Sequence, residues 1–142
     1  MRIKRNLIVA AIGLGLMATG AWADGSRAFH GQVIGSTPGE HVAGVASSGA
    51  PWVVAASEFN ISGNGRIQVE IRGLLISAGP AINTVGPVTM VSASLVCGDV
   101  VAATTGGVPL SAAGDASIHD TITVPAPCIA PAVLIRIAAT TA

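Results

Sequence analysis

The sequence predicts an all-β fold: a small antiparallel β-sandwich of about seven to eight strands with Ig-like or Greek-key connections. Two observations favour this class. Several short segments alternate apolar with polar residues, and stretches rich in glycine and proline separate these segments. Beyond residue 23, no segment shows the period of an amphipathic helix. A small closed barrel is the alternative architecture.

The chain begins with the three parts of a secretory signal peptide. A positively charged start, Met1–Arg5, precedes the uncharged apolar segment Leu7–Met17, and the small-x-small triplet Ala21-Trp22-Ala23 follows. The apolar segment has about 11 residues, whereas a transmembrane helix needs roughly 20, so a membrane anchor is the alternative that the pattern disfavours.

We expect cleavage between Ala23 and Asp24. The chain then divides into a helical signal peptide, residues 1–23, and a single mature domain, residues 24–142. The mature domain is expected to be secreted, either to a periplasm or outside the cell, and to contain no membrane span.

The mature part is mildly acidic and contains no lysine. Its four arginines stand against seven carboxylates, which gives a net charge of −3 with neutral histidines. A domain without a basic patch cannot release counterions from phosphate, so we do not expect the mature domain to bind nucleic acid. The same lack of cations argues against adhesion to anionic lipid headgroups.

The clearest secondary structure is a β-hairpin. In Arg66–Arg72, isoleucine and valine alternate with charged and amide side chains, and Glu58–Ser62 shows the same period of two. Gly63-Asn64-Gly65 lies between them, and these residues tolerate the positive φ angles of a tight turn. The apolar side chains are expected on one face and the polar ones on the other.

Shorter patterns predict the remaining elements. Further strands are expected over residues 29–34, 52–56, 74–76, 88–97, 100–104, 116–124 and 133–137. Loops are expected over residues 35–51, 78–87 and 106–114, the first of them long and mobile. In the strand 88–97, the odd-numbered residues should face the core, and Ser92 and Ser94 should face outward.

Two cysteines in an exported chain predict one disulfide, Cys97–Cys128. Two buried free thiols are the alternative. The sequence contains neither a CxxC motif nor a cluster of cysteine and histidine, so we expect no structural zinc and no thioredoxin-like redox role.

The C-terminal half also resembles a known group of proteins. The segments Ser94–Ala102, Gly114–Ala116 and Pro125–Leu134 are similar to an uncharacterised group of small secreted bacterial proteins, and Arg66–Arg72 is similar more loosely. The shared motifs are a two-cysteine frame and an acidic turn before a strand. The resemblance implies an extracellular or periplasmic protein with one disulfide, and it implies no activity.

Histidines can serve as metal ligands or as catalytic groups. His30, His41 and His119 have no spacing that would join them to a second ligand, so we expect surface positions and no cofactor. A site assembled from them by the fold is the alternative. No G-x-S-x-G elbow and no phosphate-binding loop occurs in the mature part, and we expect no catalytic residue.

Asp120 is the one unusual acid. It shares the parity of Ile118 and Ile122 in its strand and should therefore point inward unless a bulge intervenes. Because a buried carboxylate needs a partner, we expect an ion pair with Arg72 or Arg136, or hydrogen bonds from backbone N–H groups at the sheet's end. A strand end open to water is the second reading, and catalysis is the third.

These observations favour a non-enzymatic secreted domain that acts by protein contact or by self-association. Small polar residues on the outward faces and the lack of lysine leave strand edges open to pairing, although a general compositional bias would produce the same pattern. The alternative is a small secreted hydrolase or a ligand-binding sandwich that uses His119, Asp120 and the loop Gly35–Pro51. That alternative requires a concave pocket where two of these polar groups meet.

Overall fold

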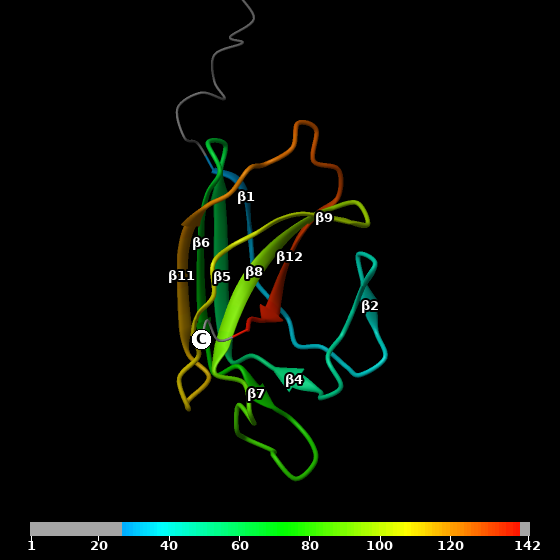
Figure 1. Ribbon diagram of the computed structural model, residues 1–142, viewed down its shortest axis with the longest axis vertical. Helices are drawn as coiled ribbons and strands as arrows, with labels where there is room; N and C mark the ends of the chain where they lie inside the picture. Colours follow the sequence, from blue (N-terminus) through cyan, green and yellow to red (C-terminus); the bar gives the residue numbers. More distant parts are fainter. Residues whose placement is uncertain (1–26, 140–142) are drawn as a thin grey trace, which may run out of the picture.

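In the computed structural model, which describes residues 27–139, the protein is all-β (Figure 1). No helix occurs among the described residues. The signal peptide, its cleavage site between Ala23 and Asp24, and the last three residues lie outside them. The strands are β1 Arg27–Gly31, β2 His41–Val42, β3 Val45–Ala46, β4 Trp52–Val53, β5 Ala56–Ser62, β6 Arg66–Arg72, β7 Leu75–Ile76, β8 Met90–Cys97, β9 Val100–Thr104, β10 Val108–Pro109, β11 Ala116–Thr121 and β12 Pro131–Ile137.

The first sheet has the strand order β1-β5-β6-β11, and all its pairs are antiparallel. Its centre is the predicted hairpin, and β6 has the predicted bounds. Ile67, Val69 and Ile71 are buried, whereas Arg66 and Gln68 are exposed, because the side chains of a strand alternate between the two faces of the sheet. The prediction of a half-buried hairpin is confirmed.

The second sheet is built around β8. Along one edge β8 pairs with β12 over seven residues, and along the other it pairs with β9 near Cys97 and with β10 near Met90. Strand β9 has the predicted bounds. Strand β10 falls in a segment that was expected to be a loop, and that expectation is wrong because Val108 and Pro109 complete the edge of β8 beyond the end of β9.

One hydrophobic core joins the inner faces of the two sheets. Valine, isoleucine, leucine and alanine make up the whole of its buried part, as the scarcity of aromatic residues requires. Burying a side chain of this size contributes roughly 1.5–3 kcal/mol. The buried core residues are Ile61, Ile67, Val69, Ile71, Leu74, Val88, Val91, Ala93, Leu95, Leu110, Ala116, Ile118 and Ile122.

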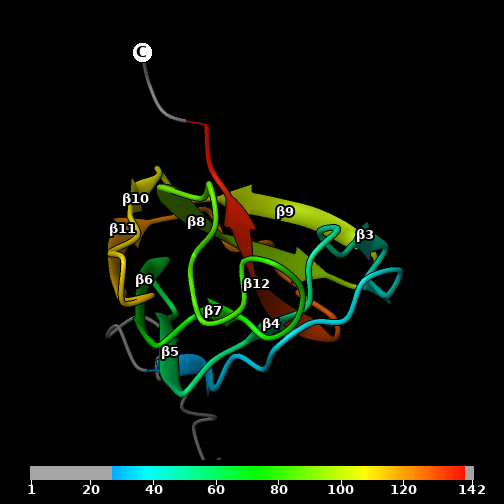
Figure 2. The same cartoon turned by 90° about the horizontal axis from the view of Figure 1, so that it is seen from below.

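Two short ribbons complete the fold. Strands β4 and β7 pair with each other and lie across one end of the two sheets (Figures 1 and 2). There Trp52 packs against the core and donates its indole N–H to the Ser48 hydroxyl at 2.8 Å. Strands β2 and β3 form a small hairpin inside residues 35–51, so the expectation of a loop without secondary structure was wrong there.

The serines of β8 differ from their predicted environment. Ser92 and Ser94 lie on the face opposite the core, as expected, yet both are buried, at 6% and 0% exposure. Their strand is central, with β12 along one edge and β9 and β10 along the other. The hydroxyls of Ser94 and Thr104 lie 2.8 Å apart and satisfy each other by a hydrogen bond.

The cysteines Cys97 and Cys128 form a disulfide in the structure, with Cα atoms 5.0 Å apart. Cys97 ends β8, and Cys128 lies in the proline-rich segment before β12. The bridge therefore links residues that are 31 apart in the sequence, and it joins the end of β8 to the segment that leads into its pairing partner β12.

No described helix is both long enough and apolar enough to cross a membrane.

Gly65 ties the hairpin to the end of β11. Its φ is +88°, and its carbonyl accepts a hydrogen bond from the N–H of Ile122 at 2.8 Å. A Cβ atom at this position would lie 2.0 Å from the carbonyl oxygen of Ile122. Only glycine combines this φ with so close a backbone approach.

We predict that Gly65→Ala lowers the free energy of unfolding by at least about 2 kcal/mol, through the left-handed backbone and the clash with Ile122. Gly49→Ala is the matched control, because nothing lies within 4 Å of a Cβ there and the φ is not positive. Denaturant unfolding measures both variants. Equal stability of the two would contradict the packing described for Gly65.

Replacing both cysteines by alanine should cost roughly 3–4 kcal/mol of stability, because the unfolded chain regains the freedom that a loop of this length removes. The same loss is expected when the wild-type protein unfolds in reductant. Thermal unfolding with and without reductant checks this, and thiol titration of the unfolded, unreduced protein should find no free thiol. An unchanged melting temperature after reduction contradicts a stabilising bridge.

Candidate functional site

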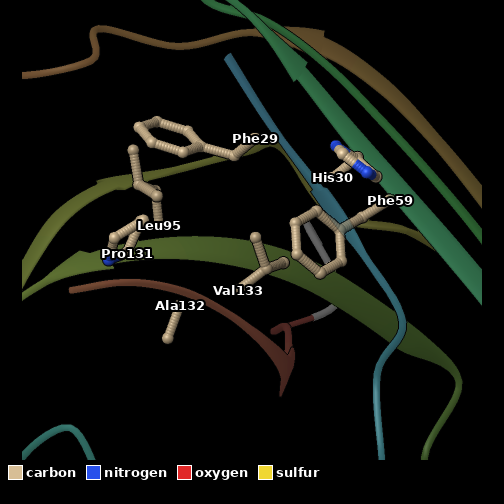
Figure 3. Close-up of a pocket in the computed structure, with 7 residues that line it drawn as sticks. All are labelled: Phe29, His30, Phe59, Leu95, Pro131, Ala132 and Val133. Atoms are coloured by element: carbon tan, nitrogen blue, oxygen red, sulfur yellow. The ribbon is translucent and has the colours of Figure 1, made fainter. Parts of the chain in front are cut away.

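The two sheets separate along one side and leave an apolar groove there. The groove has a volume of about 280 Å³ and lies between β1 and β5 of the first sheet and β8 and β12 of the second. Figure 3 shows the rings of Phe29 and Phe59 extending toward Leu95 and Val133 of the facing sheet. His30 also lines the groove but is exposed, and the lining side chains that are at least partly buried are all apolar.

The groove opens on this side because its two rims, β1 and β12, are the outermost strands of their sheets. On the other side, β10 and β11 contact each other and close the stack. There the N–H of Gly106 also donates to the Asp120 carboxylate at 2.9 Å. A hydrogen bond therefore links the two sheets along one side. Along the other side, each sheet ends in an unpaired strand edge.

Gly31 and Phe59 shape the rim of the groove. They are paired in register between β1 and β5, and a Cβ on Gly31 would lie 3.0 Å from two atoms of the Phe59 ring. The ring thus lies close over a backbone that carries no side chain. Phe59 is half-buried, at the border between core and groove.

A polar cluster occupies the outward face of the first sheet. The Glu70 carboxylate accepts a hydrogen bond from the Ser117 hydroxyl, and its other oxygen lies 3.2 Å from the Nε2 atom of His119. The side chains of His119 and Glu70 are 60% and 45% exposed. Exposed pairs of this kind contribute little to stability, and the cluster lies on a sheet face rather than in a cleft.

Asp120 does not point into the core. It is exposed, and its carboxylate accepts hydrogen bonds from the backbone N–H of Gly106 at 2.9 Å and of Thr121 at 2.8 Å. The bond from Gly106, followed by that from Thr121, holds the pKa of Asp120 below its ordinary value of 3.8. The expected backbone N–H partners at the sheet's end are confirmed, and the expected burial is wrong.

The arginines proposed as partners of Asp120 do not fill that role. Arg72 lies 3.6 Å from Asp115, whose other carboxylate oxygen accepts a hydrogen bond from the N–H of Gly73. Arg136 is exposed on β12. Asp120 does not need an ion-pair partner, because β11 ends at Thr121 and the Asp120 carboxylate is exposed to water.

The residues of the alternative enzymatic hypothesis meet only in part. His119 and Asp120 line one shallow hollow with Arg66, Gln68 and Thr121. Within it, the polar atoms of His119 and Asp120 hydrogen bond to other groups and not to each other. No residue of the predicted loop 35–51 lines the hollow.

The three histidines lie on three different strands. His30 lies on β1, His41 on β2 and His119 on β11, and all three are exposed, as the sequence predicts. Among residues 27–139 no group of three or more metal-ligating side chains comes together.

The groove was not among the sites that sequence reasoning identified. A signal for it existed: Phe29 and Phe59 are the two phenylalanines of the chain, and both occur in predicted strands. Which strands end up at sheet edges depends on pairing between distant segments, and the alternation of a strand carries no information on that point.

Comparison with models of protein families, with curated proteins and with solved structures gave no match.

Asp120→Asn should lower the melting temperature at pH 6, because the ionised carboxylate is the form that the two N–H groups stabilise. A depressed folded-state pKa contributes stability that is present above about pH 3.8 and is lost as the pH falls through the folded-state value. The difference between wild type and variant should therefore shrink as the pH falls from about 5 to 2.5.

Thermal melts across this pH range measure the effect. Asp99→Asn is the control, because no hydrogen bond among the described residues involves the Asp99 carboxylate, and it should leave the melting temperature near that of wild type. A wild-type advantage over Asp120→Asn that stays constant down to the lowest pH contradicts the assignment.

Proposed function

We propose that the mature chain, residues 24–142, is a secreted, non-enzymatic β-sandwich domain that acts by protein contact. In this proposal the contact surface is the groove between β1 and β12, and the partner supplies an extended apolar strand. The domain would work in the cell envelope or outside the cell.

Export is supported by the order of charged, apolar and small residues before Asp24. The Cys97–Cys128 bridge is consistent with an oxidising compartment, where such bonds persist. Neither a nucleic acid nor an anionic membrane surface suits the acidic, lysine-free composition of the mature chain.

The sandwich class of the proposal is supported by the two antiparallel sheets that share one core. A closed barrel would need continuous hydrogen bonding between β1 and β12, and the strand orders place both at sheet ends.

One observation carries the contact role: an apolar groove coincides with two unpaired strand edges. An edge strand offers N–H and C=O groups to an incoming strand, and the groove offers space for alternate side chains of that strand. Backbone bonds would supply affinity, and the rings of Phe29 and Phe59 would select apolar side chains. Catalysis by the alternative set lacks this support, because His119 and Asp120 are engaged elsewhere.

The proposal predicts that a photoreactive amino acid at Pro131, an exposed residue of the groove, captures a protein partner in the producing cell. The same group at Thr121, exposed on the far edge strand β11, is the matched control and should capture none. Mass spectrometry of the adduct should map the cross-link to a segment with alternating apolar residues.

Equal capture from both positions, or none from Pro131, contradicts a groove-specific contact. Hydrolysis of ester, peptide or glycoside substrates by the pure domain, lost in His119→Ala and Asp120→Ala, would instead establish the enzymatic alternative.

A further inference from the structure

We infer that the strand bound at this groove is β12 of a second copy of the chain, paired antiparallel about a two-fold axis at Leu134. This inference rests on the proposed function and specifies its partner. It follows from the unpaired edges of the two sheets, the hydrogen-bond pattern of β12, and the charge of that strand.

The strand edges are not equally open to pairing. Register shifts interrupt both β1 and β9, and a bulge of this kind protects an edge strand from further pairing. Strand β11 contacts β10. Strand β12 pairs with β8 over seven residues without a shift, and it carries no lysine. Among the described strands it therefore offers the longest regular free edge.

The pattern of hydrogen bonds shows which groups that edge presents. Ala138 donates its N–H to the carbonyl of Met90, the residue directly opposite, at 3.0 Å. Hydrogen-bonded pairs alternate along an antiparallel ladder, so the even-numbered residues of β12 bond to β8. Val133, Ile135 and Ile137 consequently direct their N–H and C=O groups away from β8. Among residues 27–139, no hydrogen bond from another segment occupies these groups.

This pattern is complementary to itself. When Leu134 lies opposite Leu134 of a second copy, Val133 faces Ile135 and Pro131 faces Ile137. Every residue with free backbone groups then meets another such residue, which gives about six hydrogen bonds between the copies. Pro131, which has no N–H to donate, falls at the end of the ladder.

Charge and side-chain chemistry favour the second copy as the occupant. Arg136 is the only charged residue of β12, and the two-fold register places it opposite Ala132, so like charges do not meet. The side chains of the groove that are at least partly buried are apolar. Strand β12 presents Val133, Ile135 and Ile137 on the face toward the first sheet, since their partners on β8 are core residues. Ile137 is 59% exposed in the single chain and would be covered by the partner.

Cysteine substitution tests the register directly. In the pair proposed, the two Leu134 Cα atoms lie about 4.5 Å apart in a non-hydrogen-bonded pair, within the range of a disulfide. The exported Leu134→Cys protein should form a covalent dimer under mild oxidation. Arg136→Cys is the matched control on the same face of the same strand, because its symmetry mate lies roughly 13 Å away along the strand and cannot be bridged.

A mixture of Ala132→Cys and Arg136→Cys proteins should form mixed dimers, since these positions face each other in this register. With the native cysteines, light scattering should show dimers whose dissociation constant rises at least tenfold in Ile137→Lys. Ile82→Lys is the control, because Ile82 is similarly exposed, at 49%, and belongs to the connection between β7 and β8 rather than to β12. Circular dichroism confirms that each variant is folded.

A folded Leu134→Cys protein that remains monomeric overturns the inference, as does equal cross-linking of Leu134→Cys and Arg136→Cys. If the photoreactive group at Pro131 nevertheless captures a different protein, the contact role stands and only the identity of the partner is wrong. If it captures nothing and the domain is a monomer, both proposals are wrong.

Discussion

The central position of β8 is the constraint on which the second sheet depends. Each backbone group of a buried strand needs a hydrogen-bond partner, and β8 obtains its partners from β12 on one edge and from β9 and β10 on the other. One face of β8 supplies Val91, Ala93 and Leu95 to the core. Ser94, on its other face, is buried as well. Strand β12 pairs only with β8 and therefore forms the border of the sheet.

The same arrangement explains why the two sides of the molecule differ. Where β10 meets β11, the carboxylate of Asp120 joins the sheets through the N–H of Gly106. Where β1 faces β12, Phe29 and Phe59 cover the core only in part. Glu70 and His119 of the first sheet interact on an exposed face, and the groove contains the chain's two phenylalanines. The proposed contact role follows from this division between a polar face and an apolar seam.

Strand pairing is a mode of contact that suits a domain of this composition. A surface without lysine and with few aromatic residues provides few side chains able to anchor a partner, whereas an unpaired edge provides regularly spaced backbone donors and acceptors. The proposed dimer would satisfy those groups and cover apolar residues of β12 in one step. It would also extend the second sheet across both copies. The two-fold symmetry of this dimer would follow from the alternation of free and bonded backbone groups along β12.

The amino-acid sequence by itself determined the local elements: the hairpin of β5 and β6, the bounds of β9, the core face of β8 and the pairing of the two cysteines. These follow from alternation, turn residues and cysteine count, which act over short distances or admit one solution. Tertiary structure decided that Asp120 is exposed, that Ser94 is buried, that Val108 and Pro109 form a strand, and that β1 and β12 border a groove. Each of these depends on which distant segments lie side by side, because burial and edge position are properties of a strand's neighbours rather than of its own residues.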